Sequence, residues 1–216
     1  MSLHLAPCSY EAAKYACERW HYSKCVPGGK NRLIGVWEDG SYIGAVIFGQ
    51  GINKNIGKAF GLVQGEVIEL VRVALSDHKA PVTRIIKIAL ILLKKANPGI
   101  HLIVSYADPM QGHEGTIYKA GNWYRLGRTP PSYCFRISGE LRHKRTFTGR
   151  DVRGRKLSPP KGAVKVKTPG KIRFGYPLTK KGKKILSGGP WRGRGIQSRN
   201  SGSIPTPPLQ SQRVLD

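Results

Sequence analysis

The residues best suited to chemistry gather in one segment, residues 105–127, which reads SYADPMQGHEGTIYKAGNWYRLG. The segment begins where an apolar run typical of a buried strand ends, and ligand sites of α/β proteins commonly lie at such strand ends. Within a few residues it holds a carboxylate, a histidine and two phenols, namely Asp108, His113, Tyr106 and Tyr118. Asp108 would end the strand and Tyr118 would lie in a short helix, so both could face one cleft. Groups of these types suit proton transfer to and from a bound substrate.

Two shorter polar blocks lie upstream. Trp20-His21-Tyr22-Ser23-Lys24 follows a run with helical spacing, and Glu69-Leu70-Val71-Arg72 lies within a run of strand-forming residues. A histidine beside a tyrosine can bind a metal through nitrogen and oxygen, or take part in proton transfer. The same pair at a helix end can instead compensate the helix dipole and pack. The spacing leaves both interpretations open.

Structural roles also stay open for the residues of the long segment. Asp108 precedes Pro109 and could be only a turn or helix-cap residue. Tyr118 could lie at the edge of the core with its hydroxyl on a strand. His113, near two glycines, could orient a loop or contact a substrate phosphate.

The elements that must position these residues follow from residue periodicity. Helices are predicted from Ser9 to Trp20, from Pro81 to Asn97 and, briefly, from Glu114 to Ala120. Strands are predicted over residues 31–40, 41–49, 65–75, 100–105 and 123–126, with a hairpin turn at Asp39-Gly40. The 65–75 strand, the long helix and the 100–105 strand imply a parallel crossover. The fold class is therefore α/β. The element order is similar to that of GNAT acyltransferases, in which a mixed central sheet flanked by helices splays to bind an acyl donor.

The composition indicates a polyanionic partner. The chain has 37 lysines and arginines against 12 acidic residues, a net charge of +25 over 216 residues. Such a surface releases counterions when it binds phosphates, so a nucleic acid is the expected partner, although a ribosomal or merely soluble basic protein carries similar charge. No apolar run reaches the roughly 20 residues of a membrane span. The first residues lack the charged and apolar parts of a signal peptide, so we expect a cytoplasmic protein.

The charge is unevenly distributed along the chain. Of the basic residues, 20 lie after residue 138, together with only 3 of the acidic ones. We therefore expect a core over residues 1–138, a basic DNA-binding extension over 139–190 and a disordered tail over 191–216. Within the extension Phe174 and Tyr176 alternate with cations. This pattern fits either docking on a nucleic acid or a short strand that covers the core.

The long segment resembles the Mom family of bacteriophage DNA-modification proteins. The family pattern runs Ser-Tyr-Ala-Asp-Pro, then Gly-His-x-Gly-Thr-Ile-Tyr, then Ala-x-x-Trp-x-x-x-Gly, and residues 105–127 match it almost throughout. The His-Tyr-Ser block at 21–23 and the Glu-Leu-x-Arg block at 69–72 resemble two further family blocks, in the same order. The resemblance covers roughly residues 10–185.

This resemblance implies a GNAT-like transferase. In the family, the exocyclic amine of adenine in phage DNA is converted to a carbamoylmethyl-type adduct that protects the DNA from host restriction enzymes, inside the host bacterium. The resemblance assigns catalysis or metal binding to His21, Tyr22, Asp108 and Tyr118, with iron as the proposed metal and His21 and Tyr22 as its ligands. Asp108 or His21 would act as the base that assists the weakly nucleophilic amine. Tyr118 would donate to an oxyanion or a leaving group.

The target amine lies inside the duplex, so base flipping is expected. A flipped adenine would stack on an aromatic ring, for which Tyr106, Trp123 and Trp37 are candidates. We expect His113 and Arg72 to contribute to substrate binding as well.

One loop departs from the GNAT pattern. GNAT enzymes hold the pyrophosphate of coenzyme A on a glycine-rich loop at a helix N-terminus. Here the loop reads Ser76-Asp77-His78-Lys79-Ala80-Pro81, with no glycine and with one amide removed by Pro81. This argues against acetyl-CoA and leaves the donor unidentified. Two other functions stay open: a non-catalytic DNA-binding protein on a GNAT scaffold, and a GNAT acyltransferase acting on another amine.

Overall fold

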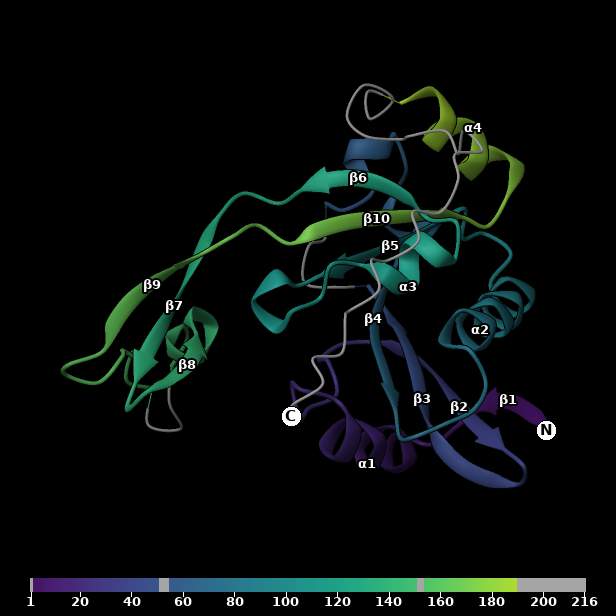
Figure 1. The fold of residues 1–216 in the computed structure, drawn as a ribbon. Coiled ribbons are helices and arrows are strands. Elements are labelled where there is room, and N and C mark those ends of the chain that lie inside the picture. The colour runs from purple at the N-terminus through teal and green to yellow at the C-terminus, as the bar shows by residue number, and fades with distance from the viewer. Residues whose placement is uncertain (1, 51–54, 151–153, 190–216) are drawn as a thin grey trace, which may run out of the picture.

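A seven-stranded mixed sheet organises the chain in the computed structural model, which describes residues 2–50, 55–150 and 154–189. Its strands are β1 (Leu3–Pro7), β2 (Asn31–Glu38), β3 (Ser41–Gly49), β4 (Val67–Leu75), β5 (Leu102–Ala107), β6 (Tyr124–Arg128) and β10 (Ile172–Pro177). They lie in the order β1-β2-β3-β4-β5-β10-β6 (Figure 1). Neighbours are antiparallel except β4 and β5, which are parallel, as the predicted crossover requires. The predicted α/β class with a mixed sheet is confirmed.

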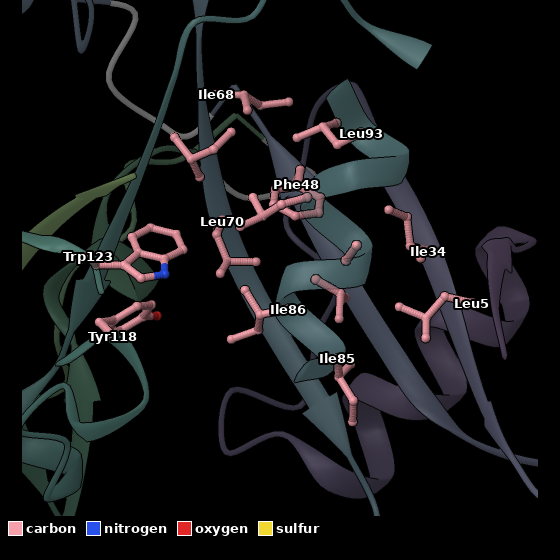
Figure 2. Close-up of a cluster of buried hydrophobic side chains, with 14 of the residues drawn as sticks. Leu5, Ile34, Phe48, Ile68, Leu70, Ile85, Ile86, Leu93, Tyr118 and Trp123 are labelled. Atoms are coloured by element: carbon pink, nitrogen blue, oxygen red, sulfur yellow. The ribbon is translucent and has the colours of Figure 1, made fainter. Parts of the chain in front are cut away.

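Two helices cover opposite faces of this sheet. In α1 (Tyr10–Trp20), the Ser9 hydroxyl accepts the Ala12 N–H as an N-cap, and the buried alanines of the helix pack on Ala45 and Ile47 of β3. The apolar side of α2 (Val82–Ala96) packs on Val46 and Phe48 instead. Alternate residues of a strand point to opposite faces, so the two helices lie on different sides. Figure 2 shows the α2 side of the core.

Two further helices are shorter. The five-residue α3 (Thr116–Ala120) follows β5 as predicted, and α4 (Lys180–Gly188) packs against β10. Single 3-10 turns, η1 (Lys58–Phe60), η2 (Gln64–Glu66), η3 (Pro109–Gln111) and η4 (Lys144–Phe147), lie in the connections.

The parallel strands β4 and β5 part before they end. Their pairing runs from Val67↔Leu102 to Leu70↔Ser105 and stops there. On its other side, β4 changes register against β3 between Leu70 and Arg72, so Val71 is an extra residue of a β-bulge. Arg72 is thereby paired with Ile47 and faces α1, whereas Leu70 faces α2. The bulge and the parting of the strands open the sheet at one place.

The boundary expected after residue 138 requires correction. Strand β10 comes from the predicted basic extension, yet it lies between β5 and β6. Phe174 of β10 is only 1% exposed, because this ring fills the core beneath α3. Of the two interpretations of this stretch, the strand that covers the core is therefore the one observed. The core thus includes residues far beyond 138, and the predicted tail over 191–216 lies outside the described residues.

A second, smaller sheet was not anticipated from the sequence. It consists of β7 (Ser132–Ile137), β8 (Glu140–His143) and β9 (Val164–Thr168) in the order β8-β7-β9. Figure 1 shows it projecting away from the main sheet beyond β6 and β10. Within the described residues, none of the helices has the length and apolar character to cross a membrane.

Candidate functional site

A pocket lies where β4 and β5 part. Its empty space is about 430 Å³, which includes open solvent at the mouth. Its walls come from the end of α1, the bulged part of β4, the end of β5, the loop before α3 and α3 itself. The lining residues are His21, Tyr22, Leu70, Val71, Arg72, Val73, Tyr106, His113, Ile117 and Tyr118. Six predicted site residues from three separate sequence blocks thus meet in one place: His21, Tyr22, Arg72, Tyr106, His113 and Tyr118.

The hydroxyl of Tyr118 is held at the floor of this pocket. Its oxygen lies 2.7 Å from Ser105 Oγ, which in turn lies 2.7 Å from the carbonyl oxygen of Leu70. The carbonyl can only accept, so the single Ser105 proton goes to Leu70, and Tyr118 must donate its own proton to Ser105. Burial raises the pKa of Tyr118 to about 12, although the Ser105 hydrogen bond opposes the shift. Tyr118 therefore stays protonated at neutral pH.

Packing fixes the ring of Tyr118 as firmly as its hydroxyl. The ring stacks on Phe174 at 4.9 Å between centroids and meets the edge of Trp123 at 5.0 Å. Figure 2 shows Tyr118 and Trp123 together beside Leu70. Gly115 makes this packing feasible, since its φ is +79° and a Cβ there would lie 2.3 Å from the Phe174 ring. The glycine of the sequence motif is thus explained by close approach.

His21 ends α1 as a neutral imidazole. Its Nδ1 accepts the backbone N–H of Ser23 at 3.1 Å and lies 2.8 Å from Ser23 Oγ, so the ring proton of the neutral form is on Nε2. Burial, followed by the positive charge of Arg72, lowers the pKa of His21 to about 4. The Tyr22 ring packs on His21 at 4.3 Å and meets His113 at 5.5 Å. These three rings line one side of the pocket mouth.

Arg72 brings a positive charge into the pocket. Its Nη1 donates to the carbonyl of Val71, but its buried Nε has no acceptor among the described residues. A buried N–H without a partner is unfavourable. Tyr106 also lines the pocket, and its pKa is raised by burial and by the carboxylate of Glu69.

Three predicted site residues do not line the pocket, namely Asp108, Trp123 and Trp37. Asp108 accepts the Met110 N–H at 3.1 Å through Oδ1 and forms an ion pair with Lys171 at 2.9 Å through Oδ2. These contacts are those of the turn or cap residue that the sequence also allowed, and its assignment as the base stays a prediction.

Trp123 and Trp37, the two tryptophans predicted to stack on a flipped base, do not line the pocket. Trp123 is only 8% exposed, with its ring against Tyr118 and Tyr176, because it belongs to the core. Trp37 packs on His4 and Tyr42 at the β1 side of the sheet. Of the three aromatic candidates for a flipped base, Tyr106 is the one in the pocket wall.

The loop before α2 does not fit the pyrophosphate of coenzyme A. The carboxylate of Glu38, at the end of β2, accepts the backbone N–H groups of Lys79 at 2.8 Å and Ala80 at 2.7 Å. These hydrogen bonds, that from Lys79 first, hold the pKa of Glu38 below its usual value. The amides that could face a phosphate are therefore occupied by an internal anion. Sequence reasoning missed Glu38, because beside Asp39-Gly40 it has the pattern of an exposed turn residue.

The pair predicted to bind iron does not fit that metal in this arrangement. A histidine that binds a metal through Nε2 usually donates a proton from Nδ1, whereas Nδ1 of His21 accepts one. No group of three or more His, Cys, Asp or Glu residues suited to a metal occurs in the described part of the chain.

Comparison with known proteins agrees with the sequence motifs. The chain is 26% identical over 131 residues to the methylcarbamoylase Mom of Escherichia phage Mu, which is 59% of this chain and 54% of that protein. The chain therefore aligns with about half the length of this curated relative.

Solved acetyltransferase structures are also similar to this chain. The Escherichia coli ribosomal-protein-S18-alanine N-acetyltransferase is 10% identical, with a TM-score of 0.46 over 82% of this chain and 95% of its own. The spermidine N-acetyltransferase of Vibrio cholerae, solved with CoA and spermine, is 12% identical, with a TM-score of 0.44 over 83% of this chain and 97% of its own.

The model of the Mom protein family matches residues 2–190. This chain belongs to the Mom protein family.

Proposed function

We propose that this protein transfers a methylcarbamoyl-type group to the exocyclic amine of adenine in DNA, and that it thereby protects phage DNA from restriction in the host cytoplasm. One observation carries the proposal: residues from all three family blocks line a single pocket at the parting of β4 and β5. The name of the phage Mu relative supplies the class of group transferred. The net charge of +25 supports DNA as the substrate.

The transfer is a substitution at a carbonyl carbon. The adenine amine forms a bond to that carbon, the donor's leaving group departs with its bonding electrons, and the amine loses one proton. Negative charge develops on the carbonyl oxygen in between. We assign the stabilisation of this charge to the Nε–H of Arg72, which has no acceptor among the described residues, because a buried donor that is already oriented needs no reorganisation during the reaction.

The proton of the amine requires an acceptor at the pocket. His21 is a weak base there, since its pKa is about 4 and its Nδ1 lone pair is occupied by Ser23. Tyr118 is protonated, and Asp108 lies outside the lining set. His113 is exposed at the mouth and its ring nitrogens form no hydrogen bond within the described residues. We assign proton acceptance to His113 and the positioning of substrate to Tyr118, Tyr106 and the Nε2–H of His21.

Two isomers of the added group have to be distinguished, because they form by different mechanisms. A carbamoylmethyl group, the form that the motifs imply, would join the amine to a saturated carbon, whereas a methylcarbamoyl group joins it to a carbonyl carbon as a urea. An oxyanion forms only in the second case, and the orphaned donor of Arg72 favours it. The two adducts have equal mass and different fragments.

The test is nucleoside mass spectrometry on plasmid DNA from bacteria that express the protein. A deoxyadenosine with added mass, whose fragments release a methyl isocyanate unit, is the expected product. Unmodified nucleosides in cells with abundant folded protein would favour a DNA-binding protein without activity. Acylated polyamines or protein amines with unmodified DNA would favour the general acyltransferase. An adduct with fragments of a carbamoylmethyl group would support adenine in DNA as the substrate but would exclude substitution at a carbonyl carbon.

A further inference from the structure

The small sheet β8-β7-β9 carries a cluster of cations that the pocket does not explain. Residues 132–168, which contain this sheet, include 11 lysines and arginines and only two acidic residues. One of these acids, Glu140, is paired with Arg142 at 2.7 Å. Positive charges held this close repel one another, and a bound polyanion relieves the repulsion.

Three of these cations surround one exposed aromatic ring. Tyr133 of β7 is opposite Lys167 of β9, and its neighbour on the same face, Phe135, is opposite Lys165. The Nζ atoms of Lys144 and Lys165 lie 5.0 and 5.3 Å from the centroid of the Tyr133 ring. Lys144, Lys165 and Lys167 form no ion pair within the described residues, so their charges are free for phosphates. We call Tyr133 and these three lysines the lysine face.

Packing beneath the lysine face keeps it in place. Phe135 is 7% exposed, and its ring meets Phe147 of η4 and Tyr133 edge-on at 5.4 and 5.5 Å. Because Lys144 begins η4, the same packing positions its ammonium group over Tyr133. The cations therefore extend from an ordered surface.

The base of the small sheet is joined to the mouth of the pocket. Thr129 N–H donates to the Lys171 carbonyl at 2.9 Å, and Lys171 N–H donates to Thr129 Oγ1 at 2.9 Å, which clamps together the two connections to the main sheet. The Lys171 ammonium then pairs with Asp108 at 2.9 Å, and the Asp108 carbonyl accepts the His113 N–H at 3.2 Å. His113 lines the pocket. A duplex held by the small sheet would thus lie beside the pocket.

We propose that the lysine face binds the phosphate backbone of double-stranded DNA and presents the duplex to the pocket. The inference rests on the proposed function and adds to it the surface that holds the substrate. Flexible lysine side chains suit phosphates as point charges and fix position without reading sequence.

The experiment measures duplex affinity against salt concentration, using fluorescence anisotropy with a labelled B-form DNA of mixed sequence. The variant is Lys144→Gln/Lys165→Gln/Lys167→Gln. The matched control, Lys87→Gln/Lys94→Gln/Lys95→Gln, removes the same charge from exposed positions of α2, far from the small sheet in Figure 1. Each lost phosphate contact lowers the slope of log affinity against log salt by about 0.9. We expect a slope smaller by about 2.7 in the lysine-face variant and an unchanged slope in the control.

Equal losses in both variants, or a wild-type slope in the lysine-face variant, would overturn the proposal. Tighter binding of an A-form RNA duplex than of DNA would overturn the choice of partner. The single variants Lys165→Gln and Lys167→Gln, each expected to lower the slope by about 0.9, serve if the triple variant folds poorly. The assay needs no group donor, so a lysine face that fails to bind is distinguishable from a pocket that fails to react.

Discussion

Tyr118 Oη lies 2.7 Å from Ser105 Oγ, at the last residue pair that joins β4 to β5. The Ser105 proton is committed to the Leu70 carbonyl, so the hydrogen bond has one direction, from Tyr118 to Ser105. The arrangement ties the phenol of the pocket floor to the point at which the sheet opens. Ser105 is therefore a positioning residue for Tyr118.

Removing either hydroxyl should lower the free energy of unfolding modestly. The two losses should overlap, because each variant breaks the same hydrogen bond. Ser105→Ala leaves the buried phenol without an acceptor and should cost about 1–3 kcal/mol in the free energy of unfolding. Tyr118→Phe removes the donor and should cost about 1 kcal/mol. Urea unfolding of both single variants and the double variant gives the coupling energy, expected at about 1 kcal/mol. Strict additivity would show that the two side chains do not interact.

The contacts of Asp108 separate a structural role from a catalytic one. Asp108→Asn keeps an oxygen that can accept the Met110 N–H but loses the charge that pairs with Lys171. We expect Asp108→Asn to retain a substantial part of the adenine modification and Asp108→Ala to lose most of it, since the alanine leaves the turn uncapped. Lys171→Gln, assayed alongside, should resemble Asp108→Asn. If the asparagine and alanine variants were equally inactive while Lys171→Gln stayed active, Asp108 would be the base.

The lowered pKa of His21 makes stability depend on pH in a defined window. The unfolded imidazole has its usual pKa of 6.5 and the folded one about 4. Between these values the unfolded state binds more protons, so the free energy of unfolding falls as the pH falls from 6.5 to about 4. Above pH 6.5 both states are neutral and this dependence vanishes.

His21→Gln should reduce this acid sensitivity. Urea unfolding of wild type and variant at pH 7.5 and pH 5 measures it, and the difference between the two pH values should be smaller in the variant. A His21→Gln variant with the full wild-type pH dependence would mean that His21 is protonated in the folded protein. His4→Gln, at the surface-exposed end of β1, is the matched control.

The Glu38 carboxylate should exclude coenzyme A from the loop before α2. Calorimetry with acetyl-CoA and the wild-type protein should show no binding, because the Lys79 and Ala80 amides are already engaged. Glu38→Ala should lower the melting temperature, since it leaves two backbone donors unpaired. Saturable wild-type binding of acetyl-CoA that competes with adenosine 3′,5′-diphosphate would contradict this account of the loop.

Local patterns in the sequence predicted much of the fold. The apolar spacing of residues 82–93 defined α2, and Asp39-Gly40 marked the β2–β3 hairpin, because both signals depend on neighbouring residues. Strand β10 was not separable from a basic extension, since its pairing with β5 joins residues 65 to 75 positions apart. The small sheet could not be predicted for the same reason, because β7 and β9 pair across a long connection.

The candidate site was predictable in its residue types and not in its geometry. His21, Arg72 and Tyr118 were selected from polar blocks in apolar surroundings, and they line one pocket. The direction of Arg72 depends on the bulge at Val71, which β3 imposes across the sheet. The burial of Trp123 depends on Tyr176 of β10. Neither relationship has a signal in the local sequence.

The most direct test of the central claim compares the nucleosides of plasmid DNA from cells expressing wild type, Tyr118→Phe, Arg72→Gln or Trp37→Phe. The account predicts modified deoxyadenosine with wild type and Trp37→Phe, at least tenfold less with Tyr118→Phe, and at least a hundredfold less with Arg72→Gln, as expected on losing an oxyanion donor. Full modification by the Arg72 and Tyr118 variants, or unmodified adenine in DNA from the wild-type culture, would contradict it.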